Sequence, residues 1–278
     1  MNATLKRSIF GTLFLAVMLG GLLFYEILYV ILFAFITAVM LSEFYRMTMG
    51  SAWLPLQRSG VLMGILFFLA ANSYFFGSFS LVHLVSLALL FVFALMVQSI
   101  VTRKDRGEFL KTAYIYAGLV YIGLPLALSN AVVSCTGAFS GLLMVAFFCI
   151  IWASDVGAYC FGLLLGKKIW TAKMSPAISP KKSWAGFFGG LLMAVLAGAI
   201  LVWTGLVSIP LYHALIMAAL MHCTGILGDL FESLWKRAAG IKDSGNILPG
   251  HGGLMDRFDS ALFAIPTGFI YLLAFGLI

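Results

Sequence analysis

The chain has 278 residues, of which 63% are hydrophobic and only 10% are charged, and its mean hydropathy is +1.08. A soluble domain could not bury so much apolar surface, and the alternating strands of about ten residues that build a membrane barrel are absent. The composition therefore predicts an all-α, polytopic integral membrane protein. The net charge of +7 does not indicate a nucleic-acid partner, because no extramembrane domain is predicted that could present a groove.

Nine transmembrane helices are predicted from the apolar segments. The first segment, residues 8–41, would be about 50 Å long as a single helix, whereas a hydrocarbon core is about 30 Å thick. Two spans that turn near Gly20, Gly21 and Glu26 fit better. A cleaved signal peptide is the rival interpretation, but no small-x-small cleavage site precedes a polar mature start. Seven further spans are predicted at residues 60–77, 79–101, 112–129, 138–165, 184–206, 210–235 and 260–278.

The basic residues set the orientation of these spans. All 17 Lys and Arg residues lie before the first span or in every second loop, and the loops between them hold none. This is the positive-inside pattern, and it predicts a cytoplasmic N-terminus and a C-terminus outside. For the first three basic segments, topology and attraction to anionic lipid explain the charge.

Four carboxylates are predicted to share one depth near the cytoplasmic edge of the membrane. Asp155 and Asp229 each lie about 25–28 Å along spans that run inward, and Asp256 and Asp259 precede or open the last span. A carboxylate costs about 2.5–3.5 kcal/mol at the bilayer centre and less near the interface, so chance placement is disfavoured. Any one of them could form an ion pair with a nearby Lys or Arg. Together they favour a site for a metal and a polyphosphate.

The loop before the last span strengthens this interpretation. Residues 233–260 combine four basic side chains and three carboxylates with a Pro-Gly-His-Gly-Gly turn. Backbone N–H groups and cations bind phosphates, whereas carboxylates bind the metal. Upstream, Asp229, Glu232, Ser233 and Lys236 share one helix face at i, i+3, i+4 and i+7. In the loop Ser179-Pro-Lys-Lys-Ser183, the last serine is predicted to cap the following helix.

The stretch from Ser233 to Asp259, S-x-x-K-R-x4-K-D-x-G-x2-L-P-x-H-G-G-x-x-D-R-x-D, resembles the signature of the phosphatidate cytidylyltransferases, or CDP-diacylglycerol synthases. The resemblance extends upstream through Asp155-x-x-Ala-Tyr-x-x-Gly, Ser179-Pro-Lys-Lys-Ser-Trp and Gly228-Asp229-Leu-Phe-Glu-Ser233. It is strong over residues 150–262, and the N-terminal spans match only by pattern.

The resemblance implies an enzyme of the bacterial cytoplasmic (inner) membrane, with its active site on the cytoplasmic side. Such an enzyme converts CTP and phosphatidic acid into CDP-diacylglycerol and pyrophosphate with Mg²⁺, and K⁺ is a possible second cation. A homodimer is also implied. Residues 1–129 would then form a lipid-embedded scaffold with possible dimer contacts, and residues 130–278 the catalytic region.

A phosphatidate oxygen is expected to attack the α-phosphorus of CTP in line, so that catalysis consists of alignment and charge neutralisation. The predicted metal ligands are Asp229, Asp256 and Asp155. The predicted catalytic residues are Asp155, Asp229, Asp256, Asp259, Lys182, Lys236, Arg237, Lys242 and Arg257. The predicted substrate-binding residues are Lys167, Ser179, Lys181, Ser183, Ser233, His251, Gly252 and Gly253.

Several alternatives stay open. An isoprenoid ether-lipid phosphate could replace phosphatidic acid, because acyl selectivity leaves no readable mark in a sequence. A transporter of phosphorylated metabolites is a different class, but the charges lie at one membrane edge and no inverted repeat is visible. His251 could donate to pyrophosphate or make a structural turn bond. His83, His213, His222 and the four cysteines, which lack CxxC spacing, are interpreted as structural.

Overall fold

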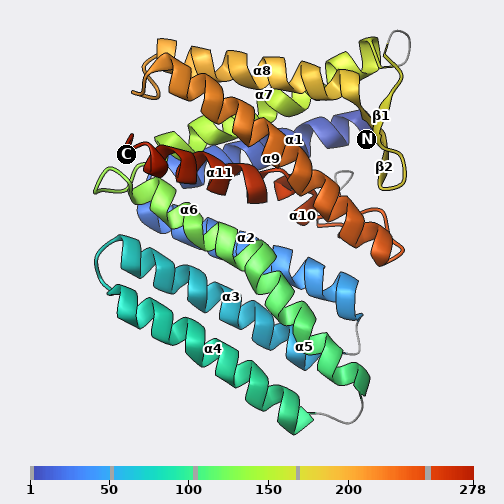
Figure 1. The fold of residues 1–278 in the computed structure, drawn as a ribbon. Helices are drawn as coiled ribbons and strands as arrows, with labels where there is room; N and C mark the ends of the chain where they lie inside the picture. Colours follow the sequence, from blue (N-terminus) through green and yellow to red (C-terminus); the bar gives the residue numbers. More distant parts are fainter. Residues whose placement is uncertain (1–2, 51–52, 103–105, 167–169, 248–251) are drawn as a thin grey trace. The chain divides into compact units, whose positions relative to one another are not determined.

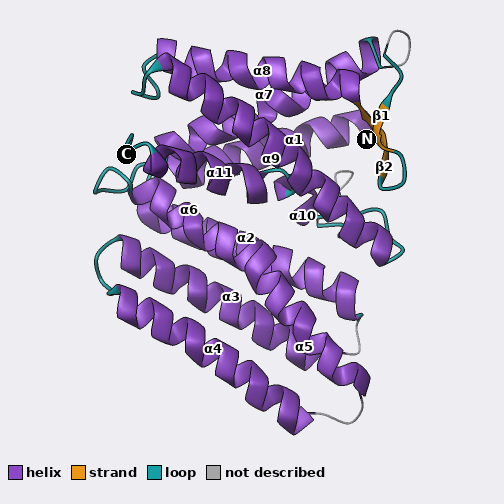
Figure 2. Ribbon diagram, viewed as in Figure 1, coloured by secondary structure: helices purple, strands orange, loops and turns teal. Residues whose placement is uncertain are grey.

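The computed structural model describes residues 3–50, 53–102, 106–166, 170–247 and 252–278, and within these ranges helices joined by loops make up the fold, with one short β-hairpin (Figures 1 and 2). The chain forms two compact units. The first comprises residues 1–140 and 243–257, and the second comprises residues 141–242 and 258–278.

The first unit is a bundle of membrane-length helices. Helix α3 packs against α2, α4 and α6, and Phe33, Phe44 and Phe68 are fully buried between the helices. Its elements are α1 (Ala3–Leu23), α2 (Glu26–Met49), α3 (Leu54–Phe75), α4 (Leu81–Thr102), α5 (Arg106–Gly118), the π-helical turn η2 (Leu119–Gly123) and α6 (Leu124–Ser134), with the first three residues of α10 (Met255–Phe258).

The second unit is built on three long helices and a hairpin. Its elements are α7 (Leu142–Leu164), β1 (Lys173–Ser175), β2 (Ser179–Ser183), α8 (Trp184–Trp203), α9 (Leu211–Ala238) and α11 (Ala261–Ala274). Helix α8 packs against α7 and α9, and α11 packs against α9 and α7. The two strands are antiparallel, with Lys173 opposite Ser183 and Ser175 opposite Ser179.

Glycine lets α7 and α8 approach closely. A Cβ on Gly157 would lie 2.7 Å from the carbonyl oxygen of Gly189, and a Cβ on Gly186 would lie 2.9 Å from the carbonyl oxygen of Ala158. Membrane helices use small residues in this way to bring their backbones together. The close approach brings the α7 residues around Ala158 against the start of α8, where the cavity described below is found.

Seven helical segments of the described residues are long and apolar enough to cross a membrane, which supports the prediction of an all-α integral membrane protein. They lie at Glu26–Met49, Leu54–Phe75, Leu81–Val101, Lys111–Ser134, Leu142–Leu164, Trp184–Trp203 and Leu211–Ala238. The other two predicted spans correspond to α1, whose apolar part is Ile9–Leu23, and to α11, which has only 14 residues and contains Pro266. The count of nine spans therefore stays a prediction.

Two predicted spans continue past a polar residue because that residue has partners inside the protein. The span predicted at 112–129 continues to Ser134, and Asn130 donates to the carbonyl oxygen of Phe68 at 3.3 Å and accepts from Asn72 at 3.2 Å. The second span was predicted to end at residue 41, but α2 continues to Met49 and carries a buried Glu43. A hydrogen-bonded polar side chain does not end a membrane helix.

The predicted division into a scaffold (residues 1–129) and a catalytic region (residues 130–278) concerns function and stays a prediction. The compact units have different bounds, since they divide at Ser140 and residues 243–257 belong with the N-terminal helices.

Candidate active site

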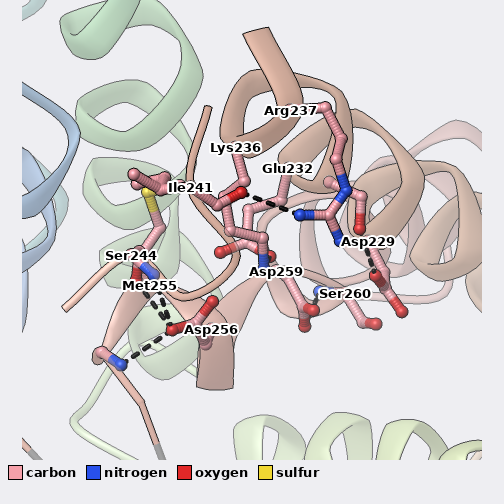
Figure 3. Close-up of polar contacts among 12 residues, drawn as sticks. Asp229, Glu232, Lys236, Arg237, Ile241, Ser244, Met255, Asp256, Asp259 and Ser260 are labelled. Carbon is pink, nitrogen blue, oxygen red and sulfur yellow. Dashed lines mark hydrogen bonds and ion pairs between the residues drawn. The ribbon is translucent and has the colours of Figure 1, made fainter. Parts of the chain in front are cut away.

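The polar face of α9 supplies the first part of the candidate site. Lys236 Nζ lies 2.6 Å from Glu232 Oε2, and the Glu232 side chain is fully buried. One turn earlier, the Ser233 hydroxyl donates to Asp229 Oδ1 at 3.4 Å. Figure 3 shows this face, with Arg237 reaching the carbonyl oxygen of Ile241 at 2.8 Å. The predicted i, i+3, i+4, i+7 pattern thus yields two polar pairs on one helix.

The helix ends where its last carbonyls are satisfied. Gly240 adopts a φ of +70°, a left-handed conformation that glycine takes without steric cost. Its N–H donates to the carbonyl oxygen of Arg237 at 3.0 Å, and the N–H of Ile241 donates to that of Lys236 at 2.9 Å. This glycine stop, typical of helix C-termini, fixes the point at which the chain leaves α9 for the basic loop.

The ion pair between Lys236 and Glu232 should stabilise the fold. Because both side chains are buried, Lys236→Met should destabilise the protein by about 3–5 kcal/mol, since it leaves a buried carboxylate without its ammonium partner. The double variant Lys236→Met/Glu232→Gln should recover much of that loss. Unfolding in mixed micelles titrated with sodium dodecyl sulfate measures the stabilities of Lys236→Met, Glu232→Gln and the double variant. Strictly additive effects of the two single changes would show that the pair is not coupled.

Three carboxylates gather in the second unit. Oxygen atoms of Asp229, Glu232 and Asp259 all lie within 4.8 Å of one another. Burial raises the pKa of Asp259 well above its usual value, and the negative charges of Asp229 and Glu232 raise it further. A bound cation would relieve this repulsion, and carboxylate oxygens are the ligands that Mg²⁺ takes from proteins. The three residues are therefore suited to hold a divalent cation.

A glycine on α9 permits this gathering. A Cβ on Gly228 would lie 2.5 Å from the carbonyl oxygen of Asp259, a backbone atom that cannot swing away. By contrast, a Cβ on Gly225, one turn earlier, would meet its neighbours at 3.5 Å or more, which is ordinary contact. The absence of a side chain at position 228 is thus required for the turn that carries Asp259 to lie against α9.

Gly228→Ala should displace the Asp259 turn and lower catalytic activity by about 10- to 100-fold, since a shift of about 1 Å at a catalytic group can cost 100-fold. The matched control is Gly225→Ala in the same helix, which should keep near-normal activity. The measurement is the initial rate of each purified variant, and circular dichroism verifies that both are folded. Equal activity in both would mean that the contact at Gly228 does not position Asp259.

A cavity of about 610 Å³ lies within the second unit, between α7, the hairpin and α9. Lys182 Nζ lies 2.7 Å from Asp229 Oδ2 and donates to the carbonyl oxygen of Ile226 at 3.4 Å. Lys173 and Lys181 from the hairpin and Asp155 from α7 also line the cavity. Apolar side chains complete the wall, including Tyr159, Leu163, Met174 and Phe187. The cavity thus combines cations, carboxylates and an apolar surface.

Ser183, which lines this cavity, caps α8 as predicted. Its hydroxyl oxygen accepts from the N–H of Gly186 at 3.2 Å, and both residues line the cavity. Ser154, also on the wall, lies 2.7 Å from Nδ1 of the buried His222, so this histidine orients a cavity residue from behind.

Asp256 lies in the first unit, where its carboxylate organises the loop that precedes it. Oδ2 accepts from the N–H of Gly253 at 2.7 Å, from the N–H of Ser244 at 3.0 Å and from the Ser244 hydroxyl at 3.0 Å (Figure 3). Gly252 adopts a φ of +83°, and a Cβ there would lie 2.6 Å from the same oxygen. Glycine at position 252 thus lets the turn fold around the carboxylate.

The predicted site residues are now placed in the fold. Asp155, Asp229, Lys181, Lys182 and Ser183 share the cavity, and Asp259 lies in the carboxylate cluster with Asp229. Ser179 begins β2, and Lys242 and Arg257 are exposed. Lys167 and His251 lie outside the described residues. Each unit therefore holds part of the predicted set.

Three functional candidates were missed as site residues, and the first is Lys173, which lines the cavity. Glu232 was recognised only as part of a helix face, although it joins the carboxylate cluster. Glu43 was not recognised at all, although its carboxylate accepts from the N–H groups of Leu254 and Met255, at 3.0 and 2.8 Å. No signal in the sequence indicated this role, because the predicted span ended at residue 41, and only the structure places Glu43 within a membrane-length helix.

Comparisons with known proteins support one family. The model of the cytidylyltransferase family matches residues 5–275. The chain is 39% identical to the phosphatidate cytidylyltransferase of Staphylococcus epidermidis over 168 residues, which are 60% of this chain and 61% of the relative. It is 36% identical to the phosphatidate cytidylyltransferase of Bacillus subtilis over 216 residues, or 76% of this chain and 77% of the relative. The match to the staphylococcal relative thus spans less than two thirds of its length.

Proposed function

Because the chain belongs to the cytidylyltransferase family, we propose that it transfers CMP from CTP to phosphatidic acid. The observation that carries this proposal is the cavity of the second unit, whose lining combines Lys173, Lys181 and Lys182 with Asp155, Asp229 and apolar side chains. The lysines suit phosphate groups, the carboxylates suit a divalent metal, and the apolar wall suits a lipid substrate.

The reaction joins two anions. An oxygen of the phosphatidate monoester forms a bond to the α-phosphorus of CTP, and the bond between that phosphorus and the bridging oxygen to the β-phosphate breaks. Pyrophosphate leaves with the electron pair. Since the nucleophile is already anionic, no strong general base is needed, and the protein has to align the two phosphates and neutralise their charge.

The carboxylates of this chain suit Mg²⁺. Asp229, Glu232 and Asp259 offer oxygen ligands within one small volume, and the family resemblance adds Asp155 and Asp256. When bound, Mg²⁺ would stabilise the charge that develops on the α-phosphate and on the leaving oxygen. K⁺ as a second cation is part of the same proposal.

The basic residues divide into two groups by their contacts. Lys181 is exposed at the cavity, and Lys182 reaches Asp229, so both can approach a phosphate there. Lys236 is buried against Glu232, and Arg237 holds the carbonyl oxygen of Ile241. We assign the binding of substrate phosphates to Lys181 and Lys182. Lys236 and Arg237 instead support the carboxylates and the loop. Lys242 and Arg257 remain candidates for the triphosphate.

The placement of the enzyme belongs to the same proposal. Nine spans, a cytoplasmic N-terminus and an active site on the cytoplasmic side of the bacterial inner membrane would let soluble CTP meet phosphatidic acid in the leaflet. The proposal also includes a homodimer. The alternating distribution of the 17 basic residues supports this orientation.

The test is product formation by the purified protein in detergent. CTP labelled in the cytosine ring should become lipid-soluble only when phosphatidic acid and Mg²⁺ are both present, and mass spectrometry should identify CDP-diacylglycerol. If CTP were converted with an isoprenoid ether-lipid phosphate but not with phosphatidic acid, the ether-lipid phosphate would be the acceptor. If proteoliposomes took up phosphorylated metabolites and no product formed in detergent, the enzyme assignment would fail in favour of transport.

A further inference from the structure

Glu43 is a buried carboxylate of α2 that contacts the glycine-rich loop about 200 residues away in the chain. Its Oε1 accepts from the N–H of Leu254 at 3.0 Å, and its Oε2 accepts from the N–H of Met255 at 2.8 Å and from the Ser244 hydroxyl at 3.3 Å. Glu43 is only 8% exposed. No ion pair of Glu43 is found within the described parts of the chain, so neutral donors of one loop solvate this charge.

The loop is shaped to admit this carboxylate. A Cβ on Gly253 would lie 2.7 Å from both Glu43 oxygens, and a Cβ on Gly245 would collide with Glu43 Oε1. Both positions therefore require glycine for the carboxylate to approach the backbone. The glycines of the loop thus leave room for the side chain of Glu43, although the two are remote in the chain.

Glu43 and Asp256 hold the same short segment from two sides. Asp256 accepts from the N–H of Gly253, and Glu43 accepts from the N–H groups of the next two residues, Leu254 and Met255. Ser244 lies between the two carboxylates, with its hydroxyl 3.3 Å from Glu43 Oε2 and 3.0 Å from Asp256 Oδ2. The single hydroxyl proton of Ser244 is shared between Glu43 Oε2 and Asp256 Oδ2, so the position of each carboxylate depends on the other.

We infer that Glu43 is a positioning residue for Asp256: by binding the two N–H groups that immediately precede Asp256, it fixes the direction in which that carboxylate presents its second oxygen. This inference rests on the proposed function, in which Asp256 takes part in holding Mg²⁺. Residues that orient a metal ligand from behind typically change metal affinity or activity by about 10- to 100-fold when they are replaced. A carboxylate suits this role because one side chain can accept from several N–H groups at once.

The discriminating variant is Glu43→Gln, which keeps the size of the side chain but replaces one acceptor oxygen with an NH₂ donor. In the full-length protein in detergent, Mn²⁺ affinity measured by the electron paramagnetic resonance of free Mn²⁺ should fall by about 10- to 100-fold. The Mg²⁺ concentration for half-maximal CMP transfer should rise by a similar factor, with kcat largely recovered at saturating Mg²⁺. Amide hydrogen exchange in residues 244–256 should accelerate. Glu26→Gln, which removes a carboxylate at the other end of α2, should leave all three unchanged.

The outcomes separate this inference from the proposed function. If the wild-type protein transfers CMP and Glu43→Gln keeps its Mn²⁺ affinity and its Mg²⁺ dependence, the positioning role is wrong and the function stands. A variant with a lower unfolding temperature and a lower kcat, but with unchanged metal affinity, would show a structural role only and would also overturn the inference. If the wild-type protein does not transfer CMP, but Glu43→Gln still loses Mn²⁺ affinity, the function fails and the positioning role is supported.

Discussion

Replacing Asp229 with asparagine should lower the rate of CMP transfer by at least about 100-fold, because the change removes a proposed metal ligand rather than a residue behind it. Asp229 contributes to both features of the second unit, since it belongs to the carboxylate cluster and lines the cavity. It also pairs with Lys182 at 2.7 Å, so its loss leaves this lysine without the ion-pair partner that holds it. No other described residue combines these three contacts.

The measurement is the initial rate of lipid-linked product formation across a range of Mg²⁺ concentrations. Asparagine keeps an oxygen that can still accept from Ser233, so α9 should stay folded and the unfolding temperature should change little. Glu26→Gln at the start of α2 is the control for the loss of one carboxylate outside the candidate site, and it should behave like the wild type. Near-normal activity of Asp229→Asn would remove this residue from the metal site.

Replacing Asp256 with asparagine should cause a loss of similar size, at least about 100-fold, for a different structural reason. The asparagine oxygen can keep the hydrogen bonds that Asp256 now accepts from Gly253 and Ser244, so the loop should hold its shape. What is lost is the negative charge. A large fall in activity with an unchanged fold would therefore show that activity depends on the negative charge of Asp256.

A second substitution at the same position provides the comparison. Asp256→Ala removes the charge and all the hydrogen bonds, so it should also accelerate amide exchange in residues 244–256, whereas Asp256→Asn should not. If the asparagine variant were active and the alanine variant inactive, Asp256 would be a structural residue of the loop. In that case the assignment of metal to Asp256 would be wrong.

The sequence was sufficient to predict the membrane fold because hydropathy and periodicity are local properties of the chain. The ends of the spans were less accurate. The predicted spans ended at residues 129 and 41, just before Asn130 and Glu43, but in the structure Asn130 bonds to Phe68 and Asn72, and Glu43 bonds to a loop far along the chain. Such partners come from tertiary structure, which hydropathy does not report.

The candidate site was predictable where its residues share one helix or one loop. The face of α9 and the cap at Ser183 followed from spacing, and both are confirmed. The pairing of Lys182 with Asp229 joins residues 47 positions apart, and sequence spacing could not distinguish this lysine from Lys181 beside it. The role of Glu43 could not be predicted from the sequence at all. It binds backbone N–H groups, and every residue of the loop except proline has one.

The most direct test of the central claim follows the phosphorus atoms of CTP. The purified protein is incubated with phosphatidic acid, Mg²⁺ and CTP labelled either on the α-phosphorus or on the γ-phosphorus. Transfer of CMP predicts that the α-label enters the lipid phase and that the γ-label appears only in pyrophosphate. Appearance of the γ-label in lipid, or release of inorganic phosphate with no label in lipid, would contradict the account.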